Sequence, residues 1–419
     1  FVDYWAYKYS DLLLVSSKKL RSNAMWAFYD WIRAGVQQNK PWDQFAREIF
    51  TGTGDSLQNG ALNYFVLHKD PIDLTENVTL AFMGQRLTCA RCHNHPLEKW
   101  TQKQYYQMAN LFSRVGLKNG TEAGDTVVFA KVSGDINHPR LLKPLAPTPL
   151  DGQPIPLDST EDRRIPFANW LTSPKNDMFA RAIVNRIWGN FMGRGIVDPV
   201  DDLRATNPAS NEELIAALTK DFVAHHYDTR YLMRTIMSSS IYQISSEANA
   251  TNQNDNRFFS KYIVKRLPAE VLLDAMSQVT GVPTAFPNYP KGFRAMQLPD
   301  TQVKSEFLTS FGRPPRVLCD AAERSVEPSI AQALHVINGD TLNKKLSAPD
   351  GYAALSIKLG LSNARLLETL FLSAYSRYPT DSEKAAMTSA LSGAKDSRQK
   401  QIEDMMWALL TGKEFMFNY

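Results

Sequence analysis

Two cysteines and two histidines lie within one ten-residue stretch, LTCARCHNHP, at positions 87–96. Cys89 and Cys92 are about one helical turn apart, so their thiols can point the same way and form thioethers with the two vinyl groups of a haem. His93 follows directly and can bring its imidazole to the iron. The CxxCH spacing therefore predicts a single haem c, with Cys89 and Cys92 as its anchors and His93 as the proximal ligand.

Other chemistries stay open for these residues. A zinc or non-haem iron site would use Cys89, Cys92 and His95, with a distant fourth ligand. Cys319 or His335 would be that ligand, because no second CxxC or HxxxH supplies the usual second pair. A redox disulfide is another alternative, although a thioredoxin-like CxxC is expected in a βαβ setting. The last alternative is a pair of inert buried thiols.

A haem iron needs either a sixth ligand or an open face, and that choice separates electron transfer from chemistry at the iron. His95 is too close to His93 in the chain to reach the opposite face of the haem without a bend. The other candidates are His335, His138, Met83 and Met108. Of these we favour His335 as the second iron ligand.

Helices are expected on both sides of the motif. Thr75 is predicted to cap a helix over 75–87 that delivers the cysteines, and Thr101 to cap a helix over 101–115. In the second helix, the positions expected to form a buried stripe are Tyr105, Met108, Phe112 and Val115. Earlier in the chain, helical patterns cover 24–39 and 40–52, the latter starting near Pro41 and stopping at Gly52.

The pattern changes after the motif. Residues 126–139, TVVFAKVSGDINHP, alternate like a strand or hairpin and run into a proline-rich stretch, and helical patterns return from Ile165. We therefore predict a helical domain over 1–125 that carries the CxxCH motif, a β-hairpin and proline-rich linker over 126–160, and a helical C-terminal domain over 161–419. The expected fold class is mainly α and multi-helical, with two helical domains joined by this small insert.

Composition narrows the partners. The 419 residues are 43% apolar and carry 47 basic against 43 acidic side chains, without a long Lys/Arg run. Nucleic acid is therefore not an expected partner. No stretch approaches the ~20 apolar residues that span a bilayer, so no transmembrane segment is expected. The chain opens at Phe1 without an initiator Met, so a signal peptide or a further domain could precede it.

Arginine clusters occur at two places in the second half. Around the glycine turn at 193–195, mixed charges could hold a haem propionate, a sugar or only the turn itself; they are Arg186, Arg194, Arg204, Asp198, Asp201 and Asp202. Near Cys319 and His335, the charged group is Arg313, Arg316, Glu323 and Arg324. Arginine clamps carboxylates and sulfates with two hydrogen bonds. Arg313, Arg324 and Arg186 are therefore our candidate contacts for substrate or propionate.

Two long stretches carry a family resemblance. The segment FMGQRLTCARCHNHPLEKWTQKQYYQMANLFSRV resembles the first of two adjacent domains of unknown function, numbered 1549 and 1553, and ARAIVNRIWGNFMGRGIVDPVDDLRATNPASNEELIAAL resembles the second. The second domain is also matched by FLTSFGRPPRVLCDAAERSVEPSIAQALHVINGDTLNKKL. Such domains occur together in large exported proteins of planctomycetes and related bacteria, often beside a cytochrome c domain. The family often has a further cysteine after the one matching Cys319, where this chain reads CDAAER.

The resemblance implies an exported bacterial protein, periplasmic or at the cell surface, with a redox role linked to the use of complex polysaccharides. A single haem must pass electrons to a redox partner protein or to copies of the same chain. We keep two alternatives to a haem protein: an exported glycan-acting enzyme with zinc or non-haem iron at the Cys/His cluster, and a non-catalytic surface assembly protein.

Overall fold

The computed structural model describes residues 1–324, 328–393 and 397–418. These residues form two compact units, each with a hydrophobic core of its own. Unit 1 comprises 1–263 together with 316–323, and unit 2 comprises 264–315 together with 324–419. Helices dominate both units, so the predicted mainly α, multi-helical fold class is confirmed.

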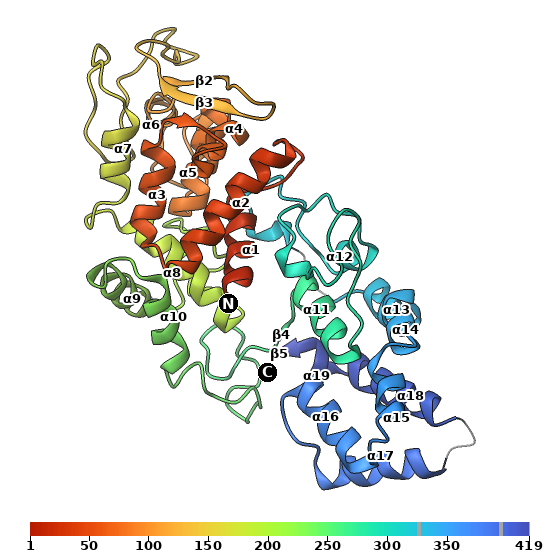
Figure 1. The fold of residues 1–419 in the computed structure, drawn as a ribbon. Coiled ribbons are helices and arrows are strands. Elements are labelled where there is room, and N and C mark those ends of the chain that lie inside the picture. The colour runs from red at the N-terminus through yellow and green to blue at the C-terminus, as the bar shows by residue number, and fades with distance from the viewer. Residues whose placement is uncertain (325–327, 394–396, 419) are drawn as a thin grey trace. The chain divides into compact units, whose positions relative to one another are not determined.

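Unit 1 is built mainly of helices (Figure 1). These helices bury aromatic and aliphatic side chains in one core. Its α-helices are α1 (Val2–Leu12), α2 (Ser22–Gln37), α3 (Trp42–Thr51), α4 (Asn63–Leu67), α5 (Pro71–Met83), α6 (Gln102–Ala109), α7 (Arg164–Leu171), α8 (Asp177–Met192), α9 (Glu212–Ala224) and α10 (Thr229–Ser238). Its 3-10 helices are η1 (Gly60–Leu62), η2 (Thr88–Arg91) and η4 (Ala321–Glu323). The predicted helix over 40–52 is confirmed as α3, with Pro41 as its N-cap and Gly52 as its C-cap.

The predicted strand after the motif is β3 (Thr126–Ala130), and it belongs to a small antiparallel sheet of unit 1. It pairs on one side with β2 (Val115–Asn119) and on the other with β1 (Gly54–Asp55). Strands β2 and β3 lie side by side at one end of this unit (Figure 1). The sheet therefore ties the predicted insert to elements from the first 120 residues.

The helix that leads into the motif, α5, begins earlier than predicted. Asp70 caps it by accepting a hydrogen bond from the backbone N–H of Ile72 at 2.8 Å, and Pro71 occupies the first helical position. Thr75 lies inside the helix, where its hydroxyl donates to the carbonyl of Pro71. The helix ends at Gly84, whose φ of 61° is left-handed and favours glycine.

The helix that follows the motif, α6, confirms the predicted cap at Thr101, which forms a capping box with Gln104. Tyr105, Met108 and Phe112 are buried as expected. The predicted helical stripe is wrong at its last position, because Val115 begins strand β2. The helix stops at Asn110, whose side-chain amide binds backbone groups of a neighbouring loop.

Unit 2 is a second helical body that also holds a short two-stranded pairing. Its helices are α11 (Ala269–Thr280), η3 (Ala295–Gln297), α12 (Glu306–Ser310), α13 (Ile330–Asn338), α14 (Asp340–Leu346), α15 (Tyr352–Lys358), α16 (Asn363–Tyr375), α17 (Asp381–Gly393), α18 (Arg398–Thr411) and α19 (Lys413–Met416). Strand β4 (Lys265–Arg266) pairs antiparallel with β5 (Phe417–Asn418). This pairing joins residues 417–418 to the first residues of unit 2.

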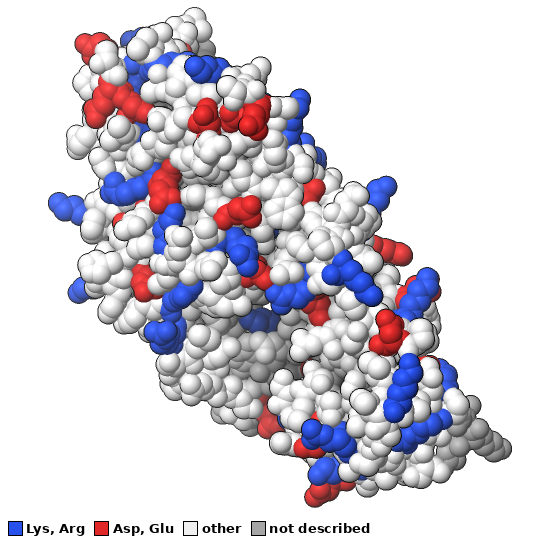
Figure 2. All heavy atoms as spheres, viewed as in Figure 1, with Lys and Arg blue, Asp and Glu red and all other residues white. Residues whose placement is uncertain are grey.

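The limits of the two compact units lie at other residues than the predicted domain limits. The predicted linker, 126–160, packs within unit 1, as do residues 161–263 of the predicted C-terminal domain. None of the helices formed by the described residues combines the length and apolarity needed to cross a membrane. On the visible face, basic and acidic side chains are interspersed (Figure 2).

Candidate haem-attachment site

The two cysteines of the motif sit on a tight turn between α5 and α6. Cys89 lies within the 3-10 helix η2 and Cys92 follows it directly. The backbone N–H groups of Cys92 and His93 both donate to the carbonyl of Cys89, each at 3.4 Å. Both cysteines are exposed, and their thiols are free. The turn therefore presents two accessible sulfur atoms to solvent.

His93 is exposed on the same turn, and its hydrogen bond determines which ring nitrogen is protonated. Its Nδ1 lies 2.7 Å from the backbone oxygen of Asn94. Because a carbonyl oxygen can only accept, Nδ1 carries the hydrogen and Nε2 keeps its lone pair. A histidine that donates from Nδ1 to a carbonyl is in the form that binds a metal through Nε2.

His95 has the opposite arrangement two residues later. It is buried, and its Nδ1 accepts hydrogen bonds from the backbone N–H groups of Leu97 and Glu98 at 3.2 and 3.1 Å. The neutral ring then carries its hydrogen on Nε2, so neither nitrogen offers a lone pair to a metal. In this conformation His95 closes the turn, and its predicted role as a metal ligand would require the ring to reorient.

Helix α6 holds the turn from its C-terminal side. The side chain of Gln102 donates to the carbonyl of Arg91 at 3.0 Å, and its backbone N–H donates to the side chain of Asn94 at 3.0 Å. These two bonds tie the first turn of α6 to both halves of the motif. Sequence reasoning did not single out Gln102, although the capping pattern at Thr101 indicated where the helix begins.

Arg86 holds the turn from the other side, three residues before Cys89. Its guanidinium lies 3.0 Å from an oxygen of Asp201 and 2.7 Å from an oxygen of Asp320. Asp201, which is fully buried, also accepts a hydrogen bond from the backbone N–H of Ala321 at 2.7 Å. The hydrogen bond to Asp320, followed by the nearby charges, raises the pKa of Arg86 despite its burial. Asp201, one of the charges predicted to cluster near the glycine turn, thus helps to anchor the residues before the motif.

Residues 316–323, which we call the strap, return from unit 2 into unit 1 and carry the third cysteine. Cys319 is buried, and burial raises the pKa of its thiol to about 12. Without a bound metal, a thiol of that kind stays protonated at neutral pH. The role of Cys319 as the distant ligand of a non-haem metal site stays a prediction.

The other candidate iron ligands of unit 1 are buried. Met83 and Met108 lie in the hydrophobic core at the ends of α5 and α6. His138 is buried as well, and its Nδ1 accepts from the backbone N–H groups of Arg140 and Leu141. Within the described ranges, no group of three or more His, Cys, Asp or Glu residues is arranged to hold a metal ion.

The favoured second ligand, His335, belongs to unit 2. Its Nε2 lies 3.1 Å from the hydroxyl of Thr341, and its ring packs edge-on against Phe307. Its role as an iron ligand stays a prediction. Its Nδ1 also lies 4.0 Å from a carboxylate oxygen of the exposed Glu306.

The three arginines expected to contact substrate or propionate each have a protein partner. Arg313 donates to the carbonyl of Val303 at 2.6 Å. Arg324 pairs with the buried Glu270 at 2.8 Å. Arg186 in α8 donates to the carbonyl of Leu80 at 3.1 Å, close enough to Cys319 to act on its pKa. Each arginine thus has a partner in its own unit, and its contact with substrate or propionate stays a prediction.

Two family models match the chain. The model described as a protein of unknown function (DUF1549), with the short name PSCyt2, matches residues 1–116. The model described as a protein of unknown function (DUF1553), with the short name PSD1, matches residues 163–391. No curated protein and no solved structure matches the chain. The pair of domains expected from the sequence is thereby confirmed.

Proposed function

The chain belongs to the DUF1553 family, with a DUF1549 domain ahead of it, and from the geometry of its CxxCH turn we propose that it is an exported c-type haem protein. Its role would be electron transfer or redox catalysis. The observation that carries the proposal is the hydrogen bond from His93 Nδ1 to the carbonyl of Asn94, which leaves Nε2 free beside two exposed thiols.

The residues of the turn have separate tasks in this proposal. Cys89 and Cys92 would hold the porphyrin through thioethers, each formed by adding an S–H group across a vinyl double bond without a leaving group. His93 Nε2 would bind the iron, with Nδ1–H held by the Asn94 carbonyl. Bound haem supplies one-electron redox chemistry. Gln102 and Arg86 keep the turn in place, because they bind backbone or carboxylate groups on both sides of it.

The wider setting rests on the resemblance. The short name PSCyt2 of the first family agrees with an association with cytochromes. A periplasmic or surface location fits covalent haem, and one haem requires a redox partner or a second copy for electron exchange. A link to polysaccharide use is part of the same proposal.

Expression in a host that attaches haem c tests the proposal. We expect the wild-type protein to keep a haem stain through denaturing electrophoresis and to show a haem c visible spectrum. The double variant Cys89→Ser/Cys92→Ser should lose both signals. Cys319→Ser is the matched control and should keep them, because that thiol lies outside the turn.

Elemental analysis of the same samples separates the alternatives. Zinc or iron without porphyrin, lost in the double variant, would support the non-haem metal site instead. A folded wild-type protein with neither haem nor metal would contradict both and favour an assembly role.

A further inference from the structure

A loop of residues 136–145 lies beside the motif and carries groups that the proposed function leaves unused. Asn137 and Pro144 form a bridge across its base. Within it, the backbone N–H of His138 donates to the carbonyl of Lys143, and that of Leu142 donates to the carbonyl of His138. We call residues 136–145 the side loop. These contacts join its two halves to each other.

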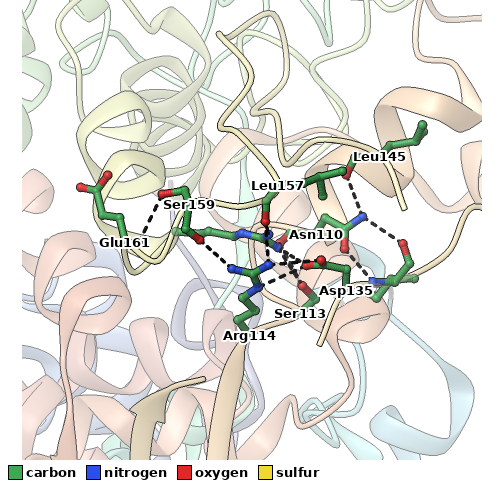
Figure 3. Close-up of polar contacts among 10 residues, drawn as sticks. Asn110, Ser113, Arg114, Asp135, Leu145, Leu157, Ser159 and Glu161 are labelled. Atoms are coloured by element: carbon green, nitrogen blue, oxygen red, sulfur yellow. Dashed lines mark hydrogen bonds and ion pairs between the residues drawn. The ribbon is translucent and has the colours of Figure 1, made fainter. Parts of the chain in front are cut away.

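The base of the side loop is fixed by Asn110, the C-cap of α6 (Figure 3). Its side-chain nitrogen donates to the carbonyls of Ile136 and Leu145 at 3.0 and 3.1 Å, and its oxygen accepts from the N–H of Ile136 at 2.7 Å. One amide thus binds both ends of the loop. Because the first turn of α6 binds the motif, the same helix positions both.

A second anchor lies at Asp135, just before the loop (Figure 3). Arg114 donates two hydrogen bonds to its carboxylate, both at 3.2 Å, and Arg163 donates another at 2.6 Å. Arg114 also binds the carbonyls of Leu157 and Ser159. These charge-assisted bonds hold the side loop in one place relative to α6.

The tip of the side loop reaches the motif. Arg140 donates from Nη2 to the carbonyl of Cys92 at 3.4 Å. Two residues after Arg140, Leu142 has a φ of 54° and is 79% exposed. A bulky side chain in the left-handed region is strained, and strain of this kind gathers at binding sites.

His138 adds a buried donor without an acceptor. Its Nδ1 accepts from the backbone N–H groups of Arg140 and Leu141, so Nε2 carries the hydrogen. Nε2 is buried, and among the described residues it has no hydrogen-bond partner. Burial, together with the charges of Lys103 and Arg140, lowers the pKa of the ring. The side loop therefore holds a buried N–H group whose hydrogen bond is not made by the described residues, at a cost in stability.

We propose that the side loop forms a wall of the haem site and that Arg140, whose exposed guanidinium lies at the carbonyl of Cys92, binds a carboxylate of the porphyrin. This inference rests on the proposed haem attachment. Besides its bond to the carbonyl of Cys92, the Arg140 guanidinium has further N–H groups to donate, and a guanidinium is well suited to bind a carboxylate with two hydrogen bonds.

Redox titration of the haem-bound protein tests the inference. Arg140→Gln removes one positive charge next to the carboxylate. The loss of this charge stabilises the oxidised iron relative to the reduced iron. We expect its midpoint potential to fall, so that the ratio of oxidised to reduced haem at a fixed potential rises about threefold or more. Arg140→Lys should stay close to wild type. Arg21→Gln, which changes an exposed arginine elsewhere in unit 1, should not shift the potential.

The possible failures are distinguishable. If wild type and all variants carry covalent haem and Arg140→Gln has the same potential as Arg21→Gln, the side loop has no such role, while the proposed function stands. A wild-type protein without covalent haem overturns both. Haem-free Arg140→Gln should keep the stability of wild type, because the exposed guanidinium is not part of the core.

Discussion

The turn at 88–95 and the strap at 316–323 both bring cysteine into unit 1, and they treat it in opposite ways. In the turn, Cys89 and Cys92 are exposed, and the contacts that hold them are made to backbone groups. In the strap, Cys319 is buried in the hydrophobic core. Surroundings, more than residue type, decide which thiol can do chemistry. The first kind can be modified, whereas the second packs as an apolar group.

The polar contacts of the two segments differ in the same sense. The strap is bound by Arg316, which is buried, lies 2.9 Å from a carboxylate oxygen of Asp11 and donates to the carbonyl of Val15 at 2.8 Å. Its guanidinium also lies over the ring of Tyr7. The turn instead keeps its reactive atoms free of such bonds. The contacts of the strap therefore stabilise unit 1, whereas the turn leaves its two thiols accessible to solvent.

The sharpest test of this comparison is thiol labelling of the haem-free protein at pH 8. We expect Cys319 to react about a thousandfold more slowly than Cys89 and Cys92, because its pKa of about 12 leaves few thiolates and burial blocks the reagent. Mass spectrometry of the labelled peptides gives the rates. Labelling of Cys319 at the rate of the other two in folded protein would break the comparison.

The next effect concerns the strap's anchor. Arg316→Met should lower the free energy of unfolding by about 3 kcal/mol, because it leaves Asp11 and the buried carbonyls without their donor. Urea unfolding measures the loss. The matched control is Arg377→Met in unit 2, which bridges Glu383 and Glu414 near the surface and should cost less than about 1 kcal/mol. Equal losses would show that burial does not set the strap apart.

A smaller effect separates the two histidines of the turn. In haem-free protein, His95→Ala should cost about 1 kcal/mol, since two backbone N–H groups lose their acceptor, and His95→Asn should restore part of it. His93→Ala should cost less than about 0.5 kcal/mol because that ring is exposed. Thermal unfolding measures both.

In haem-bound protein the order should reverse. His93→Ala should change the visible spectrum, while His95→Asn leaves it intact. If the spectrum changes in the His95 variant and not in the His93 variant, His93 is not the iron ligand and the proposed assignment is wrong.

The smallest effect is a dependence on pH. The hydrogen bond from Arg86 lowers the pKa of Asp320 against the opposing effect of burial. A carboxylate with a lowered folded pKa stabilises the protein above its unfolded pKa of about 4, and this stabilisation is lost as pH falls through the folded value. We expect wild type to lose more stability than Asp320→Asn between about pH 4 and pH 2, by under about 1 kcal/mol. Parallel pH profiles for the two proteins would contradict this.

Local patterns predicted local structure well. The cap at Thr101 and the end of α3 at Gly52 follow from side chains and backbone within a few residues. The sequence predicts a cap at Thr75, but the cap is Asp70, five residues earlier, with Pro71 at the first helical position. Val115 continued the helical period, yet Asn110 ends α6 through bonds to residues 136 and 145, which no local pattern reveals.

The site was predictable in its residue types and not in its detail. Spacing alone identified Cys89, Cys92 and His93, but it cannot distinguish the protonated nitrogen of His93 from that of His95. The tautomer depends on how the loop closes on each ring. The bond between Arg86 and Asp320 joins residues 234 positions apart, so it appears only once the chain is folded.

The return of the strap has a consequence for synthesis on the ribosome. The first 263 residues emerge without Asp320, the partner that holds Arg86 next to the motif, and without Arg316, the partner of Asp11. Nascent unit 1 must therefore wait until residues 316–323 have been synthesised before its last anchors arrive. A fragment cut at the unit boundary would reproduce that immature state, with Arg86 paired to Asp201 but without Asp320.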